Sequence, residues 1–523
     1  MSSSIFMPPR LSRRRLLAGA VAGTASLMLP RFAHAALSDP ALDRDTLVVG
    51  LERSFASLDA SATVTSDSDR YGWQIFDSLY GFDANGNLTP RLATSYTASA
   101  DGLSYTYRLR PHVKFHNGQV FSAADVRFSL QHILNPATKS TRRLQFEPIF
   151  DHIDTPDDLT VVFHLKSADG VFPNKIAGYL PILAQHYGSA VPEVEFFATT
   201  PVSAGPYKVK QFNRDGRYLE LERFEDYWDV KPRIKKLVFK VIPEASSRTN
   251  ALLTGEIDLA VGLPFQDIER LRKVGDIEVV TAPVGSPLIV RPYANIPGSP
   301  FAKREVRQAL NYAIDSQAII KNVLHGAGEP LASMTSRYYP YGVDPALKPY
   351  PYDPAKAKQL LVAAGYPDGF RAKMYAGNDH PKEIAEAVAA YWSQVGIHID
   401  IQVLEYSAWA ALSNAHQAKP LTVQQMANAI YDPAHPVIGT FSKNGFASDY
   451  YNPAVQALID EVIPLQGAAA RGEVFKKINQ LTHDDGGVVF ISELYQVYAK
   501  KRHVAWQPQR GSAILNFRQI AWS

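Results

Sequence analysis

Hydrophobic residues along this chain follow two different periods. Residues 46–51 and 236–242 are short, mostly apolar runs, which are typical of buried strands. Residues 105–109 and 161–165 lie near turn signals such as Asp101-Gly102, and this arrangement predicts hairpin strands. These segments supply the strands of the expected fold.

Other segments have the signals of helices. Ser122-Ala-Ala-Asp125 resembles a capping box, with Asp in place of the preferred Glu, and predicts a helix through Leu134. A second helix is predicted over 355–364, after Asp353-Pro354. A third, over 383–395, leads into the alternating strand pattern of 397–403. Strands that alternate with helices of this length predict an α/β fold with largely covered sheets.

The first 35 residues resemble an export signal. A basic stretch ends in Ser12-Arg-Arg-Arg15, an apolar run covers 16–29, and Ala33-His-Ala35 is a small-x-small cleavage site. The paired arginines resemble a twin-arginine signal, and the alternative is an arginine-rich Sec signal. We therefore expect export to the periplasm with cleavage after about Ala35.

Composition narrows the possible functions. The 523 residues include no cysteine, so thiol nucleophiles, disulfides, cysteine zinc sites and iron–sulfur clusters are excluded. The net charge of +3 comes from the export segment, because without its five arginines 49 basic residues face 51 acidic ones. No basic surface for nucleic acid is indicated. No apolar run near 18 residues follows position 36, so we expect a soluble mature protein.

Motifs of enzymes and of metal sites are scarce in the sequence. The chain has no Gly-x-Ser-x-Gly elbow and no phosphate-binding loop, so a secreted hydrolase is an unfavoured alternative, and we expect no cofactor. His112 and His116 have the spacing of two metal ligands on a helix. Pro111 and Asn117-Gly118 around them favour a strand and a turn, so we interpret both histidines as structural.

Two groups of motifs follow one another across nearly the whole mature chain. The first group consists of Leu88-Thr-Pro-Arg-Leu-Ala93, Asp101-Gly-Leu-Ser-Tyr-Thr-Tyr-Arg-Leu-Arg110, Val113-Lys-Phe-His-Asn-Gly118 and Phe121-Ser-Ala-Ala-Asp-Val126. The later group consists of Ala204-Gly-Pro-Tyr207, Val306-Arg-Gln-Ala-Leu-Asn-Tyr-Ala-Ile-Asp315, Tyr352-Asp-Pro-Ala-Lys-Ala-Lys358 and Gly396-Ile-His-Ile. In their order these motifs resemble the bacterial extracellular solute-binding proteins of family 5, which serve peptide-type and nickel-type ABC importers.

The resemblance implies a two-lobed periplasmic-binding-protein fold, large, type II-like and of cluster C, with an inserted subdomain. A solute would be bound between the lobes and delivered to the permease subunits of an ABC importer. The chain would act as a monomer near the inner membrane, without nucleic acid. The expected parts are 36–88 for the start of lobe I, 89–200 for the inserted subdomain, 201–286 and 494–523 for the rest of lobe I, and 287–493 for lobe II.

The resemblance also bears on the ligand. Dipeptide-binding members have an Asp three residues before an Asp-Pro pair, and here that position is Ala429. They also place an Arg before the helix of the Trp-x-x-Val-Gly motif, and residues 375–379 contain none. A buried ammonium or carboxylate without a counter-charge is costly, so free dipeptides are disfavoured.

Nickel-chelate members have a Tyr directly before the Asp-Pro pair and an Arg after the signature helix. Tyr431 matches the first position, and Arg142 or Arg143 the second. The Trp of those members is Ala427 here, and His435 is the nearest histidine. Ordinary packing for Tyr431 and a solvated helix end for the arginines are the structural alternatives.

The family architecture suggests further residues that would face the ligand, although aromatic residues at such places can equally belong to a core. Uncharged amides in place of charged groups would suit a polar solute. The main hypothesis is thus a non-enzymatic receptor for a peptide-like or other small polar solute, with a nickel or metallophore receptor as the alternative. The further candidates are Ser54, Phe55, Tyr71, Trp73, Asn378, Asp379 and Asn428.

Overall fold

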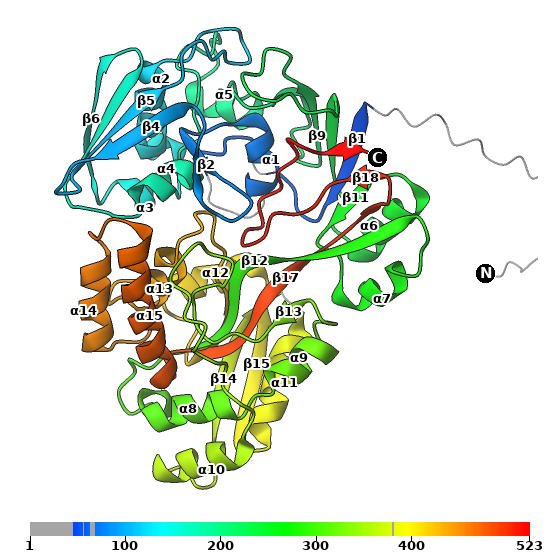
Figure 1. Cartoon of the computed structure of the whole chain (residues 1–523). Helices are drawn as coiled ribbons and strands as arrows, with labels where there is room; N and C mark the ends of the chain where they lie inside the picture. The colour runs from blue at the N-terminus through cyan, green and yellow to red at the C-terminus, as the bar shows by residue number, and fades with distance from the viewer. Residues whose placement is uncertain (1–44, 56, 63–67, 379–380) are drawn as a thin grey trace, which may run out of the picture. The chain divides into compact units, whose positions relative to one another are not determined.

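Eleven strands form the largest sheet of the computed structural model, which describes residues 45–55, 57–62, 68–378 and 381–523 (Figure 1). The predicted export segment and Asp379 lie outside these residues. In spatial order the strands are β15 (Ile397–Leu404), β14 (Phe370–Gly377), β16 (Leu421–Gln425), β12 (Ile277–Pro292), β17 (Val489–Lys501), β11 (Leu259–Val261), β1 (Thr46–Leu51), β10 (Lys236–Val241), β9 (Tyr218–Arg223) and β8 (Tyr207–Phe212), with β13 (Gly328–Glu329) paired to β17.

The two halves of this sheet share the long strands β12 and β17 (Figure 1). These strands pair antiparallel from Ile277 opposite Lys501 to Val290 opposite Val489. Their register shifts between Pro283 and Pro287, where the backbone ladder is interrupted. The interruption matters for the candidate site, because it leaves backbone groups to be paired by side chains.

The predicted strands are confirmed. β1 pairs parallel with β10 from Thr46 opposite Lys236 to Leu51 opposite Val241, which is all of the first predicted run and all but the last residue of the second. The two predicted hairpin strands are β5 and β7, which pair antiparallel with Tyr107 opposite Val161. They belong to a four-stranded antiparallel sheet whose edge strand β4 has four exposed residues out of six, so this sheet is covered less completely than expected. Its order is β4 (Ala93–Ala98), β5 (Ser104–Leu109), β7 (Thr160–Leu165) and β6 (Phe150–Asp157).

Two short strand pairs complete the sheets, and helices connect them. The short pairs are β2 (Tyr80–Phe82) with β3 (Leu88–Pro90) and β18 (Val504–Ala505) with β19 (Ala521–Trp522). The helices are α1 (Ser68–Ile75), α2 (Ala123–Leu134), α3 (Arg143–Phe146), α4 (Phe172–Tyr179), α5 (Glu193–Thr199), α6 (Ala245–Thr254), α7 (Ile268–Leu271), α8 (Arg304–Tyr312), α9 (Ser316–Asn322), α10 (Pro354–Ala363), α11 (Lys382–Ser393), α12 (Tyr406–Asn414), α13 (Ala434–Phe441), α14 (Pro453–Val462) and α15 (Ala468–Asp484).

The predicted helix ends are also found. The backbone N–H of Ser122 donates to Asp125 Oδ2 at 2.9 Å, so the shorter Asp completes the capping box of α2. Asp353 accepts the N–H of Lys356 at 2.8 Å and begins α10. Gly365, just past this helix, has a φ of 85°, the left-handed conformation that glycine adopts most easily. Local chemistry thus sets these boundaries.

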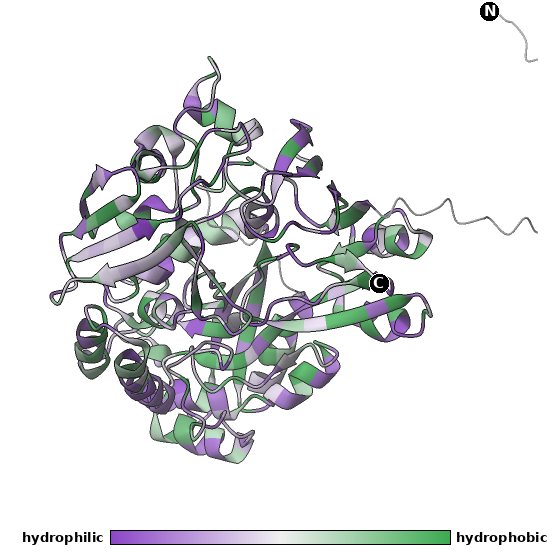
Figure 2. Ribbon diagram, turned by 45° about the horizontal axis from the view of Figure 1, so that its top comes forward, coloured by the Kyte–Doolittle hydropathy of each residue, from purple (hydrophilic) through white to green (hydrophobic). Residues whose placement is uncertain are grey.

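Apolar side chains on the two halves of the large sheet pack into separate cores. Leu47 and Leu237 lie in one core, while Leu310 and Trp392 lie in another, where the indole N–H donates to the Leu310 carbonyl at 3.0 Å. Figure 2 shows hydrophobic residues along the central strands and mixed colouring on the surrounding helices. No helix of the described residues combines the length and the hydrophobicity that crossing a bilayer requires. The lobe boundaries given above stay predictions.

Candidate functional site

The loop after β1 approaches helix α12. Ser54 is exposed, as the prediction requires, and its neighbour Arg53 places its guanidinium carbon 5.3 Å from the ring centre of Tyr406. Asn378 is also exposed, and its side-chain oxygen accepts the backbone N–H of Tyr406 at 2.9 Å. Segments far apart in the sequence therefore meet at Tyr406.

Two aromatic candidates lie in a core. Phe55 and Tyr71 are buried, and their rings pack edge to face with centroids 5.0 Å apart. Phe212 and Phe239 enclose Phe55 further. Trp73, on α1, is half-buried. Phe55 and Tyr71 are not included in the proposed site, because their surfaces are already covered by protein.

The two arginines after the signature helix have different surroundings. Arg142 is buried, donates through Nη1 to the Gly178 carbonyl at 2.8 Å, and lies 5.8 Å from the ring centre of Tyr179. Arg143 points outward and pairs with Glu147 one helical turn away. Arg142 is therefore the arginine that reaches the interior.

Beside Arg142, Tyr179 links the first part of the chain to α13. Its hydroxyl lies 3.5 Å from Nδ1 of His435. Desolvation, with a smaller contribution from the charge of Lys175, lowers the pKa of His435 to about 4. The imidazole of His435 is therefore neutral at physiological pH.

Asn428 braces the loop that carries the Asp-Pro pair. Its Nδ2 donates to the Asp432 carbonyl at 2.9 Å, and its Oδ1 accepts the N–H of Ile430 at 2.9 Å. Asp432 pairs with Arg471 at 3.2 Å, and Tyr341 bonds to both. Buried ionic partners of this kind fix a backbone conformation rather than leave groups for a ligand.

Tyr431, in the same loop, has a φ of 51° and a buried side chain. Its ring centre lies 5.0 Å from that of Phe82. A Cβ atom on Gly86 would be 2.5 Å from Tyr431 Cδ1, and one on Gly511 would be 3.0 Å from Cε1, so both glycines let the ring fit. No group of the described residues pairs with its hydroxyl in hydrogen-bonding geometry.

Burial raises the pKa of the Tyr431 phenol well above its ordinary value, and the nearby side chains of Ser512 and Gln509 offset only part of this. Phe82, Gly86 and Gly511 belong to the predicted first lobe, whereas Tyr431 belongs to the predicted second lobe. The tyrosine is thus a place where segments of both predicted lobes meet.

Glu493, on β17, is a buried acid that the sequence reasoning missed. Its Oε1 accepts the backbone N–H of Ser286 at 3.0 Å, and nothing in the described part of the chain pairs with its Oε2. Desolvation, reinforced by the charge of Glu329, raises the pKa of Glu493 to about 7. The Ser286 bond opposes this rise, and so, to a smaller extent, do the Ser336 side chain and the Gly285 backbone. A lone acid within the apolar run of β17 was the sequence signal that could have revealed it.

Tyr339 connects Glu493 to Tyr431. Its hydroxyl donates to the Gly285 carbonyl at 2.6 Å, next to Ser286. Its pKa is raised first by burial and then by the charges of Glu493 and Tyr431, which therefore lie nearby. The hydroxyl of Ser286 is buried and, across the residues that the structure describes, unpaired as well. Tyr339 thus bonds to the residue next to Ser286 and lies near Glu493 and Tyr431, and each of these three residues has an unpaired polar atom.

A second buried polar group follows β1. Arg70 and Glu52 form an ion pair of 2.6 Å, and Oε2 of Glu52 has no hydrogen-bond partner among the described residues. Burial alone would raise the pKa of Glu52, but the Arg70 guanidinium holds it below its ordinary value. Tyr498 lies close enough to Glu52, Arg70 and Tyr431 for their charges to be coupled.

The histidines that we interpreted as structural have the predicted backbone. Lys114 and Val120 form an isolated bridge around a turn at Asn117-Gly118, with no helix. Nε2 of His116 lies 3.0 Å from the carbonyl oxygen of Gly205, and burial lowers the pKa of His116 to about 4.

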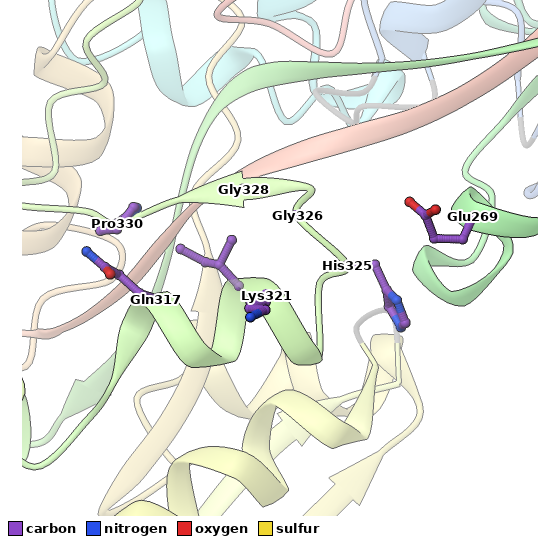
Figure 3. Close-up of a pocket in the computed structure, with 8 residues that line it drawn as sticks. Glu269, Gln317, Lys321, His325, Gly326, Gly328 and Pro330 are labelled. Carbon is purple, nitrogen blue, oxygen red and sulfur yellow. The ribbon is translucent and has the colours of Figure 1, made fainter. Parts of the chain in front are cut away.

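A pocket of about 460 Å³ lies between α7 and α9, and neither Glu493 nor Tyr431 lines it (Figure 3). Figure 3 shows Gln317 and Lys321 on one helix and Glu269 on the other side. None of the residues singled out from the sequence lines it. The lining residues are Glu269, Gln317, Ile320, Lys321, His325, Gly326, Gly328 and Pro330.

Comparison with known proteins decides the family. The profile of the bacterial extracellular solute-binding proteins, family 5 (middle), matches residues 87–448. The chain belongs to family 5 of the bacterial extracellular solute-binding proteins. The glutathione-binding protein GsiB of Pectobacterium atrosepticum is 32% identical over 387 residues, which are 72% of this chain and 73% of that protein.

Solved structures agree with this assignment. The periplasmic binding protein DppA from Helicobacter pylori, in complex with the peptide STSA, has a TM-score of 0.79 at 26% identity and covers 91% of this chain and 98% of its own. NikA from Staphylococcus aureus, in complex with Ni(L-His)2, has a TM-score of 0.75 at 21% identity and covers 91% and 100%, which supports the fold alone.

The predicted fold class and function class are confirmed. This family 5 protein has the two-lobed periplasmic-binding-protein fold and captures a solute for an ABC import system. The family consists of substrate-binding transport proteins that work with ABC permeases, in the periplasm or outside the cell. The identity of the solute depends on the residues described above.

Proposed function

We propose that this family 5 protein binds a small peptide-like solute and that Glu493 holds its ammonium group. One observation carries the proposal: the buried Oε2 of Glu493 has no partner in hydrogen-bonding geometry among the described residues, and the hydroxyls of its neighbour Ser286 and of Tyr431 are unpaired as well. Buried polar atoms are nearly always paired, so a set left open together is best explained by a ligand that completes it.

The charge of the site supports an ammonium group. Ala429 stands where dipeptide-binding members have an Asp, which was one of the two reasons to disfavour free dipeptides. Glu493 supplies a buried carboxylate from β17 instead. The like charge of Glu329 makes Glu493 easier to neutralise, and a cationic ligand would do so without protonation.

Binding to peptides tests the proposal. Calorimetric titration with glutathione and with Ser-Thr-Ser-Ala should give saturable binding, and N-acetylation should weaken it by about tenfold or more, as expected for loss of a charged partner. Glu493→Gln should weaken the binding of the free peptide and leave the binding of the acetylated peptide unchanged. Glu278→Gln is the matched control, because that carboxylate lies on the neighbouring strand β12 and already pairs with Lys500 at 2.7 Å. Equal affinity for both forms of the peptide would reject the ammonium assignment.

We also propose that the solute leaves unchanged. Mass spectrometry of a peptide incubated with the protein should recover it intact, while the melting temperature rises with peptide concentration by mass action. A shortened peptide would favour the hydrolase alternative.

A nickel or metallophore receptor is the second candidate, favoured by the meeting of Arg142, Tyr179 and His435. A neutral imidazole can ligate a metal, and an arginine can hold the carboxylate of a chelator. Titration with Ni(L-His)2 should then depend on His435 and Tyr431, so an unchanged affinity in H435A and Y431F would remove this candidate.

Export is the remaining part of the proposal. We propose that the first 35 residues direct twin-arginine export, because paired arginines precede an apolar run and a small-x-small site. Replacing Arg13 and Arg14 by Lys should retain the uncleaved chain in the cytoplasm. Unchanged export, with mature protein still appearing in the periplasm, would favour the Sec alternative.

A further inference from the structure

Two histidines and an aspartate lie together on the four-stranded sheet, in strands β6 and β7. Nε2 of His164 is 3.1 Å and Nε2 of His152 is 3.8 Å from Oδ2 of Asp154. The imidazole rings stack with centroids 4.2 Å apart and an interplanar angle of 7°. Ligand atoms of all three side chains lie within 4.8 Å of one another.

The register of the two strands produces this cluster. His152 is paired directly with His164, and Asp154 follows two positions later on the same face of β6. Ile153 between them pairs with the buried Phe163 and packs on the core. β6 is an edge strand, so the side chains of His152 and Asp154 are exposed and can reach an ion from solvent (Figure 1).

A fourth residue orients one ring. Oδ2 of Asp151 lies 2.8 Å from Nδ1 of His152, within hydrogen-bonding distance. The other ring nitrogen of His152, Nε2, is then directed towards Asp154 and His164. Histidines that bind metals commonly bond through their other ring nitrogen to a carboxylate, which fixes the tautomer and strengthens the ligand. The arrangement of Asp151, His152 and Asp154 has this form.

We propose that His152, Asp154 and His164 bind a divalent transition-metal ion such as Zn²⁺, with Asp151 as the supporting residue. In a tetrahedral site with bonds of about 2.0–2.1 Å, neighbouring ligand atoms are about 3.3 Å apart. The Asp154 oxygen is 3.1 and 3.8 Å from the two histidine nitrogens, so small side-chain rotations would bring the three ligands to an ion. Two imidazoles favour Zn²⁺, Ni²⁺ or Cu²⁺ over Mg²⁺ and Ca²⁺, which prefer oxygen ligands. Water would complete the coordination.

This site is separate from the proposed solute site. None of its residues contacts Glu493, Tyr431 or Arg142 in any interaction found in the described structure. It is also unrelated to the nickel alternative, which uses His435. Its ligands belong to the predicted inserted subdomain, residues 89–200, whereas Tyr431 and His435 come from the predicted second lobe.

Calorimetric titration of the tag-free, chelator-treated protein with ZnCl2 near neutral pH tests the proposal. One Zn²⁺ should bind per chain, and His164→Gln should abolish this binding. Asp151→Asn should weaken it by roughly 10–100-fold, the usual effect of losing a supporting carboxylate. An excess of MgCl2 should not compete.

His398→Gln is the matched control, because His398 is an exposed histidine on strand β15. It should leave the Zn²⁺ titration unchanged, and all variants should keep the circular dichroism of the parent protein. Retention of the bound Zn²⁺ in H164Q, or an absence of binding to the parent protein, would overturn the proposal and leave the histidines as a stacked cross-strand pair.

Discussion

Glu493 accepts the backbone N–H of Ser286 at 3.0 Å across the two strands that both halves of the large sheet share. The contact lies where the register of β12 and β17 shifts between Pro283 and Pro287. Because the ladder is interrupted there, a side chain takes the place of a backbone acceptor. The same irregularity thus holds Oε1 of Glu493 in place, and Oε2 is left for a ligand to bind.

The affinity for a peptide should depend on pH through Glu493. Its pKa of about 7 in the free protein means that the carboxyl is partly protonated near neutrality, whereas an ammonium group favours the ionised form. Peptide affinity should therefore rise between about pH 6 and pH 8, with release of a proton on binding. Titration calorimetry in buffers of different ionisation enthalpy measures this proton. E493Q should abolish the release, and an identical pH dependence in this variant would contradict the assignment.

The stability of the ligand-free protein should fall as the pH rises, whereas the affinity for a peptide should rise. A carboxyl whose pKa is raised from 4.5 to about 7 binds its proton more tightly in the folded state. The free energy of unfolding therefore falls as pH rises from about 5 to 7, by up to about 3 kcal/mol. E493Q should stabilise the protein at about pH 8 and have much less effect at about pH 5, as urea unfolding can measure. Equal effects at the two pH values would show that Glu493 titrates normally.

Local sequence signals predicted the elements that depend on neighbouring residues. The apolar run of β1, the Ser122 capping box and the Asp353 helix start are each determined by residues within one turn or strand. The family motifs added the fold class, because their order spans the chain. These features could be read without knowing any long-range contact.

The candidate site depended on contacts that the sequence does not contain. Arg142 and Arg143 are adjacent and chemically identical, and only the packing around Gly178 distinguishes them. Phe55 has the sequence position of a cleft residue, yet in the folded chain it packs against Phe239. Glu493 was missed because its importance comes from an unpaired oxygen, which is a property of the folded chain.

The two arginines provide a direct comparison of stability. Arg142→Gln should lower the free energy of unfolding by about 1–3 kcal/mol, because it leaves the buried Gly178 carbonyl without its donor. Arg143→Gln should have almost no effect, because its partner Glu147 is on the surface. Urea unfolding of both variants checks this prediction. Similar losses in both would mean that Arg142 is not the interior arginine.

Gly86 should be needed because of the ring of Tyr431. A Cβ at Gly86 would lie 2.5 Å from Tyr431 Cδ1, and Gly86 also has a φ of 79°. Gly86→Ala should therefore cost about 1–2 kcal/mol for the left-handed backbone and about 1–3 kcal/mol more for the steric clash. Gly118→Ala is the matched control, since its φ is 85° and a Cβ there would meet no atom within 4 Å.

A double-mutant cycle with Tyr431→Ala separates the two costs. Removing the ring relieves the clash and leaves the backbone strain. In the Tyr431→Ala protein, the loss of unfolding free energy caused by G86A should therefore shrink to the loss caused by G118A. Urea unfolding gives all the free energies required. Since Gly86 and Tyr431 belong to different predicted lobes, the coupling energy also measures how firmly these segments are held together without ligand. An additive cycle would mean that the ring moves away from Gly86 in solution, and that this contact does not hold the two segments together.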